Sequence, residues 1–178
     1  MKLINIRDDK KYLPAIFRLY KSAFPYEERA PFLLLLRRTR RDGFDLLALE
    51  EDGRFAGLMY TVRYRDILYI FYLAVAEERR GKGLGSGALR AIRDQNPGRR
   101  VILNIEEVDP KYPNYEQRVT RLRFYERNGF RPTDLNTLEY GVVYTMLESS
   151  GYVSREEYYA LMTQFFGEKA FRKIFREL

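Results

Sequence analysis

Residues 71–87 read FYLAVAEERRGKGLGSG, in which an apolar run is followed by four charged residues and then by four glycines within seven positions. The apolar residues predict a strand over 67–75, and the residues after the glycines predict a helix that ends near 96–98. Glycine lets backbone N–H groups converge on a phosphate, and a helix N-terminus adds a favourable dipole. The stretch therefore predicts a strand, a phosphate-binding loop and a helix.

Two other nucleotide-binding motifs compete for this loop. A P-loop requires Ser or Thr directly after its lysine, but Lys82 is followed by Gly83. The Rossmann fingerprint fits better, because Gly83-x-Gly85-x-x-Ala88 matches its degenerate form and Glu106 follows about 20 residues later. Against it, the charged residues 77–80 separate the strand from the glycines, and a hairpin precedes the unit. The loop alone leaves the dinucleotide alternative open.

The rest of the chain predicts an α+β fold, a mixed α/β sandwich in which helices pack on one sheet. An Asp-Gly pair at 52–53 predicts a hairpin turn, and Ser154 with Glu157 forms a capping-box pattern that begins a helical tail. We expect one domain over 1–178, with a core of about 1–148 and a helical extension of about 152–178. The expected strands are 2–7, 44–50, 54–64, 67–75, 101–106, 134–139 and 141–148, and the expected helices before the tail are 10–24, 31–41, 84–96 and 115–127.

The composition excludes several chemistries. The 178 residues contain no cysteine and no histidine, so a thiol nucleophile, a histidine base, a Ser-His-Asp triad and the usual zinc ligand sets are ruled out. The formal net charge of +7 suits an anionic partner such as a phosphorylated cofactor, a nucleic acid or a membrane surface. The longest apolar run without tyrosine, 32–36, and the run 67–76 with its two tyrosines are both far shorter than the roughly 20 residues that span a bilayer.

Two segments resemble a known family. The strand 71–75 followed by Arg80-x-x-Gly83-x-Gly85 resembles the acetyl-CoA motif (Q/R)-x-x-G-x-(G/A) of the GNAT acetyltransferase superfamily. Residues 124–130, FYERNGF, are similar to that family's "lYek-GF" segment on the next helix. The two segments occur in the family's order, separated by one helix and one strand. The resemblance covers about 44–148 and implies a GNAT-like fold with a mostly antiparallel central sheet.

The resemblance also implies the cofactor and the reaction, which is direct transfer of acetyl from acetyl-CoA to a primary amine in a ternary complex. No metal is expected. Strand main-chain groups would bind the pantetheine arm, amides of the loop would hold the pyrophosphate, and a strand amide near Val75 would stabilise the oxyanion. The cofactor-binding residues that it implies are Leu73, Ala74, Val75, Arg80, Gly81, Lys82, Gly83, Leu84, Gly85 and Ser86.

The same resemblance implies the catalytic groups. Tyr125 matches the family tyrosine that can protonate the leaving thiolate. Glu106, at the end of the strand next to the coenzyme strand, is the first candidate for the general base, and the loop pair Glu27 and Glu28 is the second. The helix departs from the family pattern because it carries Arg118 and three further arginines, which we expect to form a solvated face.

The expected partner is an amine acceptor, either a small molecule or a peptide. Neither a nucleic acid nor a membrane is expected, and the default location is the cytoplasm. The aromatic tail is expected to pack on the domain or on a second copy of the chain, which would make a homodimer. A catalytically silent acyl-CoA sensor is the alternative function, and a nucleic-acid-binding protein using the positive charge is a third.

Overall fold

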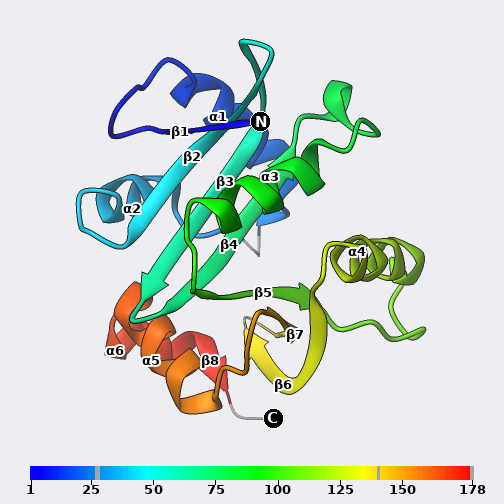
Figure 1. Ribbon diagram of the computed structural model, residues 1–178. Coiled ribbons are helices and arrows are strands. Elements are labelled where there is room, and N and C mark those ends of the chain that lie inside the picture. Colours follow the sequence, from blue (N-terminus) through cyan, green and yellow to red (C-terminus); the bar gives the residue numbers. More distant parts are fainter. Residues whose placement is uncertain (27–28, 140, 177–178) are drawn as a thin grey trace. The chain divides into compact units, whose positions relative to one another are not determined.

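The computed structural model describes residues 1–26, 29–139 and 141–176. The chain divides into two compact units, Met1–Arg99 and Arg100–Leu178, which are described in turn (Figure 1).

The first unit is built on an antiparallel sheet in the order β1-β2-β3-β4. Asp52 and Gly53 both have positive φ, of 53° and 71°, as a two-residue type I′ turn requires, so the predicted Asp-Gly hairpin is confirmed. β2 and β3 are buried along most of their length and supply much of the core of this unit. The strands are β1 (Lys2–Asn5), β2 (Phe44–Glu51), β3 (Arg54–Tyr64) and β4 (Ile67–Val75).

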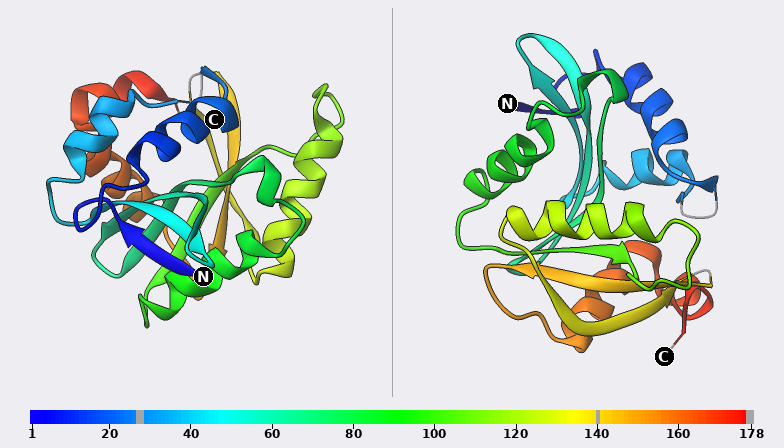
Figure 2. Two further views of the ribbon diagram at one scale, coloured as in Figure 1. Left: turned by 90° about the horizontal axis from the view of Figure 1, so that it is seen from above. Right: turned by 90° about the vertical axis from the view of Figure 1, so that its right-hand side faces the viewer.

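Helices cover both faces of this sheet. In Figure 2, α3 lies on one face of β1–β4 and α1 and α2 lie on the other. The buried side chains of α3 are Ala88, Leu89 and Ile92, and those of α1 are Ile16 and Tyr20, which is the spacing expected of amphipathic helices. The helices are α1 (Leu13–Ala23), α2 (Phe32–Arg38), the short 3-10 helix η2 (Glu77–Arg79) and α3 (Leu84–Asp94).

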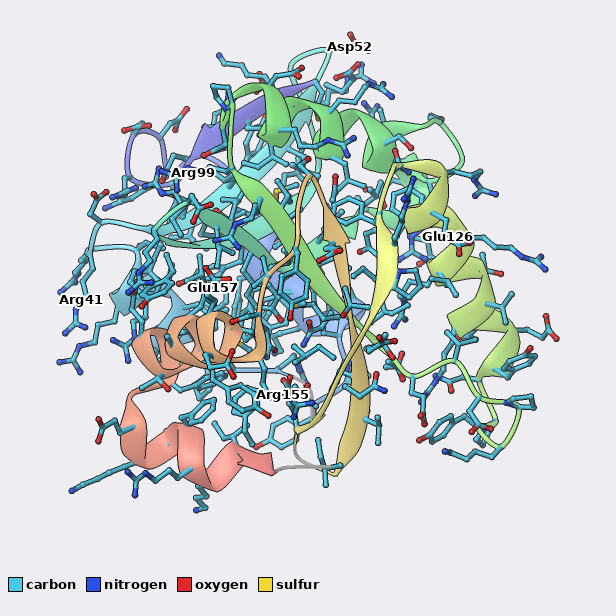
Figure 3. All side chains as sticks on the ribbon, turned by 60° about the horizontal axis from the view of Figure 1, so that its bottom comes forward. Arg41, Asp52, Arg99, Glu126, Arg155 and Glu157 are labelled. Carbon is cyan, nitrogen blue, oxygen red and sulfur yellow. The ribbon has the colours of Figure 1, made fainter. Side chains whose placement is uncertain are left out.

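The second unit is an antiparallel sheet in the order β5-β7-β6-β8 with three helices. The predicted capping box of α5 is confirmed, because the Ser154 side chain accepts from the Glu157 amide and the Glu157 side chain accepts from the Ser154 amide. Glu157, labelled in Figure 3, also receives two hydrogen bonds from Arg100 at 2.7 and 2.9 Å, which hold α5 against the start of β5. The elements are β5 (Arg100–Glu106), α4 (Tyr115–Arg127), β6 (Arg131–Glu139), β7 (Val142–Ser149), α5 (Arg155–Phe166), α6 (Glu168–Ile174) and β8 (Phe175–Arg176).

The expected mixed α/β fold is confirmed, and β4 and α4 have the predicted bounds. The end of the tail was predicted wrongly as helix, because Phe175 and Arg176 form β8 and pair with Glu139 and Leu138 of β6. Helical spacing of aromatic residues cannot distinguish these two outcomes over so short a segment, since backbone pairing with β6 is a tertiary contact. No helix within the described ranges is long and apolar enough to cross a membrane.

Candidate functional site

The strand β4 carries the three residues expected to bind the cofactor through their main chain. Leu73, Ala74 and Val75 are paired with Met59, Leu58 and Gly57 of β3. A Cβ at Gly57 would lie 2.3 Å from the Ala74 carbonyl oxygen, so only glycine allows this close approach of the two strands.

A register shift in the same ladder places one extra residue in β4. Tyr60 pairs with Tyr72 and Thr61 pairs with Ile70, so Phe71 is the extra residue of a β-bulge. Bulges bend a strand and increase its local twist. The bulge therefore changes the direction of β4 immediately before the three expected cofactor-binding residues.

The glycine loop between β4 and α3 presents a series of unpaired amides. Gly81 and Gly83 have φ of 75° and 71°, and an added Cβ would have no atom within 4 Å at either position, so one side of the loop is open. Gly83 is the N-cap of α3 and offers no side chain to its amides. Within the described ranges, no protein group accepts a hydrogen bond from any amide of residues 81–86. Such amides together with a helix N-terminus can hold an anion.

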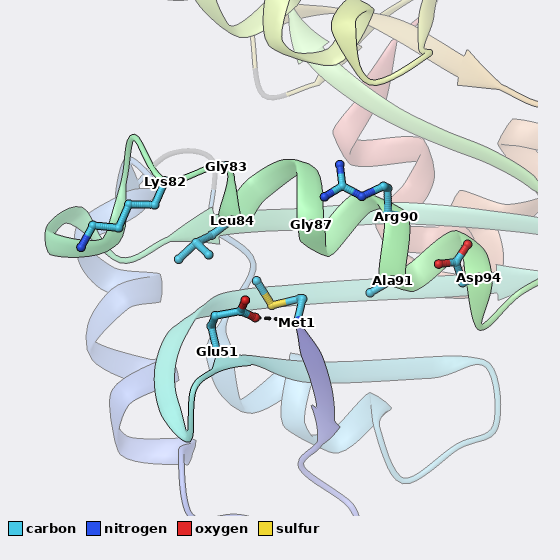
Figure 4. Close-up of a pocket in the computed structure, with 9 residues that line it drawn as sticks. All are labelled: Met1, Glu51, Lys82, Gly83, Leu84, Gly87, Arg90, Ala91 and Asp94. Carbon is cyan, nitrogen blue, oxygen red and sulfur yellow. Dashed lines mark ion pairs between the residues drawn. The ribbon is translucent and has the colours of Figure 1, made fainter.

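Cations and a cavity lie next to this loop. The Arg80 Nε donates to the Val75 carbonyl at 3.3 Å, which ties the loop back to β4. A cavity of about 310 Å³ follows α3 from its first residue to its last. Figure 4 shows Lys82 and Arg90 among its lining residues, together with the ion pair between the Met1 amino group and Glu51. Its lining residues are Met1, Glu51, Lys82, Gly83, Leu84, Gly87, Arg90, Ala91 and Asp94.

Two tyrosines fix the chain between α1 and α2 against β4. The Tyr72 hydroxyl accepts from the Ala30 amide at 3.0 Å, and the Tyr20 hydroxyl donates to the Ala30 carbonyl at 2.8 Å. The two rings meet edge to face at 5.1 Å, and burial raises the pKa of Tyr20 well above its usual value. The candidate bases Glu27 and Glu28 lie outside the described residues.

Tyr125 lies in the last turn of α4 and is partly buried. Its ring contacts Phe124 and Phe130 at centroid distances of 5.0 and 5.8 Å. Burial raises the pKa of Tyr125 to about 12, and the positive charge of Arg121 opposes part of that rise. Within the described ranges, no side chain forms a hydrogen bond with its hydroxyl group. The phenol therefore stays protonated at neutral pH and can donate to a ligand atom.

Glu106 is held by two arginines from α4. Its Oε1 lies 2.9 Å from Arg118 Nη2 and its Oε2 lies 2.5 Å from Arg121 Nη1, while Asn114 Nδ2 donates to Oε1 at 3.3 Å. The side chains of Glu106 and Arg118 are each 7% exposed. The expectation that the arginines of α4 form a solvated face is thus wrong for Arg118, which also donates to the Glu107 carbonyl at 2.7 Å. Any amine that approaches Glu106 competes with two cations.

A second carboxylate, the partly buried Glu139 at the end of β6, was missed by the sequence analysis. Its Oε1 accepts from Thr137, Asn104 and Tyr158 at 2.8, 3.2 and 3.1 Å. Burial raises the pKa of Glu139 from the usual 4.5 to about 7, and the three hydrogen bonds oppose part of the rise. A glutamate at the end of a hairpin strand is normally exposed. Only the tertiary position of α5, which no local pattern predicts, buries this one.

A family model described as an acetyltransferase (GNAT) domain matches residues 42–132, which run from just before β2 to the start of β6. Among curated proteins, "Putative acetyltransferase YjbC" from Bacillus subtilis (strain 168) is 29% identical over 82 residues. That alignment covers 46% of this chain and only 40% of the length of the relative.

Solved structures with the same fold extend the likeness over most of the chain. An acetyltransferase assigned to the GNAT family from Bacteroides thetaiotaomicron superposes with a TM-score of 0.78 at 18% identity and covers 96% of this chain and 98% of its own. The ribosomal-protein-S18-alanine N-acetyltransferase from Escherichia coli gives a TM-score of 0.63 at 15% identity and covers 86% of this chain and 96% of its own. An aminoglycoside 6'-N-acetyltransferase complexed with coenzyme A gives a TM-score of 0.62 at 13% identity. That alignment covers 84% of this chain and 96% of the other. At these identities the likeness establishes the fold alone.

Proposed function

Because this chain belongs to the GNAT acetyltransferase family and is an acyltransferase, we propose that it transfers acetyl from acetyl-CoA directly to a primary amine in a ternary complex. The observation that carries the proposal is the loop 81–86, whose amides lack protein acceptors and stand at the start of α3. Those amides fit a pyrophosphate, which needs several converging donors. The family match supports coenzyme A as the pyrophosphate-bearing ligand.

The donor-binding residues are proposed to act through the main chain. Leu73, Ala74 and Val75 would bind the pantetheine arm along β4, and the amides of 81–86 would bind the pyrophosphate, since the Arg80 amide already donates to the Glu77 carbonyl at 3.1 Å. Bound acetyl-CoA supplies an activated acetyl thioester. Glycine at 81 and 83 leaves the loop open to a ligand, because an added Cβ would project into space that no protein atom fills. Lys82 and Arg90 add positive charge beside the loop.

Tyr125 is proposed as the general acid that gives its phenolic proton to the leaving sulfur. A coenzyme thiol has a pKa near 8.5, so a phenol with a pKa of about 12 transfers its proton uphill. The placement of the Tyr125 hydroxyl next to the sulfur must therefore supply most of its contribution to the rate. It would do so through a hydrogen bond that strengthens as negative charge develops on sulfur. The hydroxyl, which has no hydrogen-bond partner among the described residues, and the ring contacts with Phe124 and Phe130 suit that role.

The assignment of Glu106 as the general base stays a prediction. Its favourable features are burial and its place at the end of β5. Its two ion pairs favour a second role, in which Glu106 joins β5 to α4 and so positions the helix that carries Tyr125. A variant that separates these roles is described in the Discussion.

We also propose that the two compact units form one domain. The family match at 42–132 includes residues on both sides of the boundary between Arg99 and Arg100. The likeness to the Bacteroides thetaiotaomicron protein over 96% of the chain supports the inclusion of the tail in that domain. The acceptor is proposed to be a small molecule or a peptide that carries a primary amine, which is the class that the names of the structural neighbours span.

The test combines donor binding with turnover. Acetyl-CoA should raise the Tm of the protein whereas NAD should not, and a panel of amines should release free coenzyme A thiol from acetyl-CoA. The absence of cysteine means that the protein contributes no thiol background. A protein that binds acetyl-CoA but releases no thiol with any amine would support the acyl-CoA sensor, and one that acetyl-CoA fails to stabilise would contradict the proposal.

A further inference from the structure

Four side chains of the second unit meet around the Glu139 carboxylate, and they come from three different elements. Glu139 and Thr137 lie on β6, Asn104 lies on β5 and Tyr158 lies on α5. Asn104 Nδ2 donates to the Tyr158 hydroxyl at 2.6 Å as well as to Glu139. Thr137 and Tyr158 are buried, whereas Glu139 and Asn104 remain partly exposed. The charged end of the cluster is therefore reachable from solvent.

The cluster contains a carboxyl group that can ionise, although its own packing does not require a charge. Thr137, Asn104 and Tyr158 all donate to one oxygen of Glu139, and a neutral amide oxygen at this position could accept from the same groups. Burying a carboxylate is costly unless a cation accompanies it. Within the described ranges, no lysine or arginine forms an ion pair with Glu139, and no charged group contributes to its raised pKa. A bound cation would therefore compensate the charge of the ionised carboxylate.

A second acceptor in the cluster supports the same conclusion. The Asn104 Oδ1 is buried and has no hydrogen-bond donor within the described part of the chain. Its amide nitrogen donates to the carboxylate and the tyrosine, and its oxygen is covered by other atoms, so a ligand donor reaches that oxygen only once those atoms move aside. A buried carbonyl oxygen without a donor is rare in folded proteins and usually indicates a missing partner. One carboxylate and one amide oxygen can both accept from a single ammonium group, which has three donors.

A metal ion is a poorer match for this cluster. Calcium needs six to eight oxygen ligands, and magnesium needs near-octahedral geometry. No group of three or more acidic side chains that could hold a metal exists among the described residues. The Glu139 carboxylate and the Asn104 amide oxygen, beside the neutral Tyr158 hydroxyl, suit an ammonium ion better than a metal ion.

We propose that Glu139 and Asn104 form a subsite for an ammonium group of the acceptor, so that the substrates of this enzyme are cationic alkylamines. This inference rests on the proposed function for the identity of the ligand as the acceptor, but the binding of an ammonium group can be tested without turnover. Tyr158 and Thr137 act as positioning residues, because they hold the Glu139 carboxylate through Oε1.

The binding experiment uses the full chain with its glutamate carboxyl carbons labelled with ¹³C. The Glu139 resonance, assigned from its loss in Glu139→Gln, is titrated with pH in the presence of n-butylammonium and, as the matched neutral probe, n-butanol. A bound ammonium favours the carboxylate form, so the apparent pKa of Glu139 should fall from about 7 with n-butylammonium and stay unchanged with n-butanol. Identical titrations with the two probes would overturn the proposal and leave the cluster as an anchor for α5.

The kinetic experiment compares Glu139→Gln with Glu148→Gln, which removes the same charge from β7 of the same unit. Glu139→Gln should raise KM for an alkylamine acceptor about tenfold or more, while the Kd for coenzyme A should not change. Glu148→Gln should leave both unchanged. Equal KM values for Glu139→Gln and the wild type would contradict the proposal. Wild-type protein that responds to n-butylammonium but does not bind acetyl-CoA would instead contradict the proposed function.

Discussion

The Phe130 amide donates to the Tyr125 carbonyl at 3.1 Å, and the two rings lie 5.8 Å apart. The Gly129 amide donates to the Glu126 carbonyl at 2.9 Å, and Gly129 has a φ of 81°. These two bonds form a Schellman motif, in which glycine takes the left-handed position and the next residue packs back on the helix. The motif gives a physical reason for the sequence Tyr125-x-x-x-Gly129-Phe130, because the helix end and the buried Phe130 together fix the tyrosine.

Gly129→Ala should therefore reduce both stability and turnover. Alanine in the left-handed region costs about 1 kcal/mol, and relief of that strain would loosen the last turn of α4. Gly98→Ala is the matched control, since Gly98 has a similar φ of 78° and nothing within 4 Å of an added Cβ. Both variants should lower the Tm in thermal denaturation, but only Gly129→Ala should lower kcat. Equal kcat values for the two variants would show that the Schellman motif does not position Tyr125.

Removal of the Tyr125 hydroxyl tests the general acid. Tyr125→Phe should lower kcat by about 10- to 1000-fold and leave the Kd for acetyl-CoA unchanged, because the hydroxyl acts on the leaving group. Since burial raises the pKa of Tyr125 to about 12, wild-type activity should show no loss from phenol ionisation up to about pH 10. Tyr115→Phe, on the same helix, is the control. Stopped-flow release of thiol from preformed complexes separates chemistry from binding, and unchanged release by Tyr125→Phe would remove the residue from the mechanism.

The glycine loop can be tested through its N-cap. Gly83→Ala should weaken coenzyme A binding by about tenfold, because alanine disfavours the φ of 71° that aligns the amides of 81–86. Gly53→Ala carries the same φ of 71° in the β2–β3 turn and serves as the control for stability. Calorimetric titration with coenzyme A measures the affinity of each variant. Equal affinities for the two variants would mean that the loop conformation does not matter for binding.

The buried ion pair of Glu106 predicts an asymmetry between its two arginines. Arg118→Met should lower the free energy of unfolding by about 3 kcal/mol, because it leaves a buried carboxylate short of a partner. Arg121→Met should cost about 1 kcal/mol or less, since the Arg121 side chain is 44% exposed. Urea denaturation provides both values, and similar losses would contradict the assignment of Arg118 as the buried partner.

Glu106→Gln separates the two roles of that residue. If Glu106 is the general base, this variant should lose kcat at every pH while Arg118→Met retains most of it in the folded state. Should Glu106 only position α4, the two variants should lose kcat in proportion to the disturbance of the helix. Steady-state kinetics at several pH values, together with the Tm of each variant, decide between these roles.

Glu139 should make stability depend on pH in a defined window. Its pKa is raised from 4.5 to about 7, so the native state holds a proton that the unfolded state has released over that range. The free energy of unfolding should consequently fall as the pH rises from about 4.5 to 7 and should level off above that. Glu139→Gln removes this dependence and should be more stable than the wild type at pH 8, by on the order of 2 kcal/mol after allowance for partial exposure. A lower Tm for Glu139→Gln at pH 8 would contradict the raised pKa.

Local patterns predicted the parts of the fold that depend on neighbouring residues. The apolar run of β4, the Asp-Gly turn at 52–53 and the helix over 115–127 each have a short-range physical cause, and each was predicted correctly. The capping box of Ser154 belongs to the same class. The open conformation of the glycine loop was also predictable, because it depends on glycines that lie close together in the sequence.

The electrostatic part of the site could not be predicted in the same way. Arg118 reads as a surface residue in a basic helix, and its burial depends on Glu106, which is 12 residues away in sequence and on another element. Glu139 reads as the exposed end of a hairpin strand, although Tyr158, 19 residues later, covers it. The pairing of Phe175 with Glu139 is another contact between distant residues. Which charges are buried is decided by tertiary packing, and a single sequence carries little information on it.

The pairing of the tail with β6 also links proton binding to local unfolding. Tyr158 of α5 and Phe175 of β8 both meet Glu139, so the tail covers part of this carboxylate. Release of the tail would hydrate Glu139, lower its proton affinity and expel a proton wherever the pH lies between about 4.5 and 7. By thermodynamic reciprocity, alkaline conditions must favour release of the tail and acidic conditions must favour its docking. Amide hydrogen exchange in α5 and α6 should therefore report the protonation of a side chain on another strand.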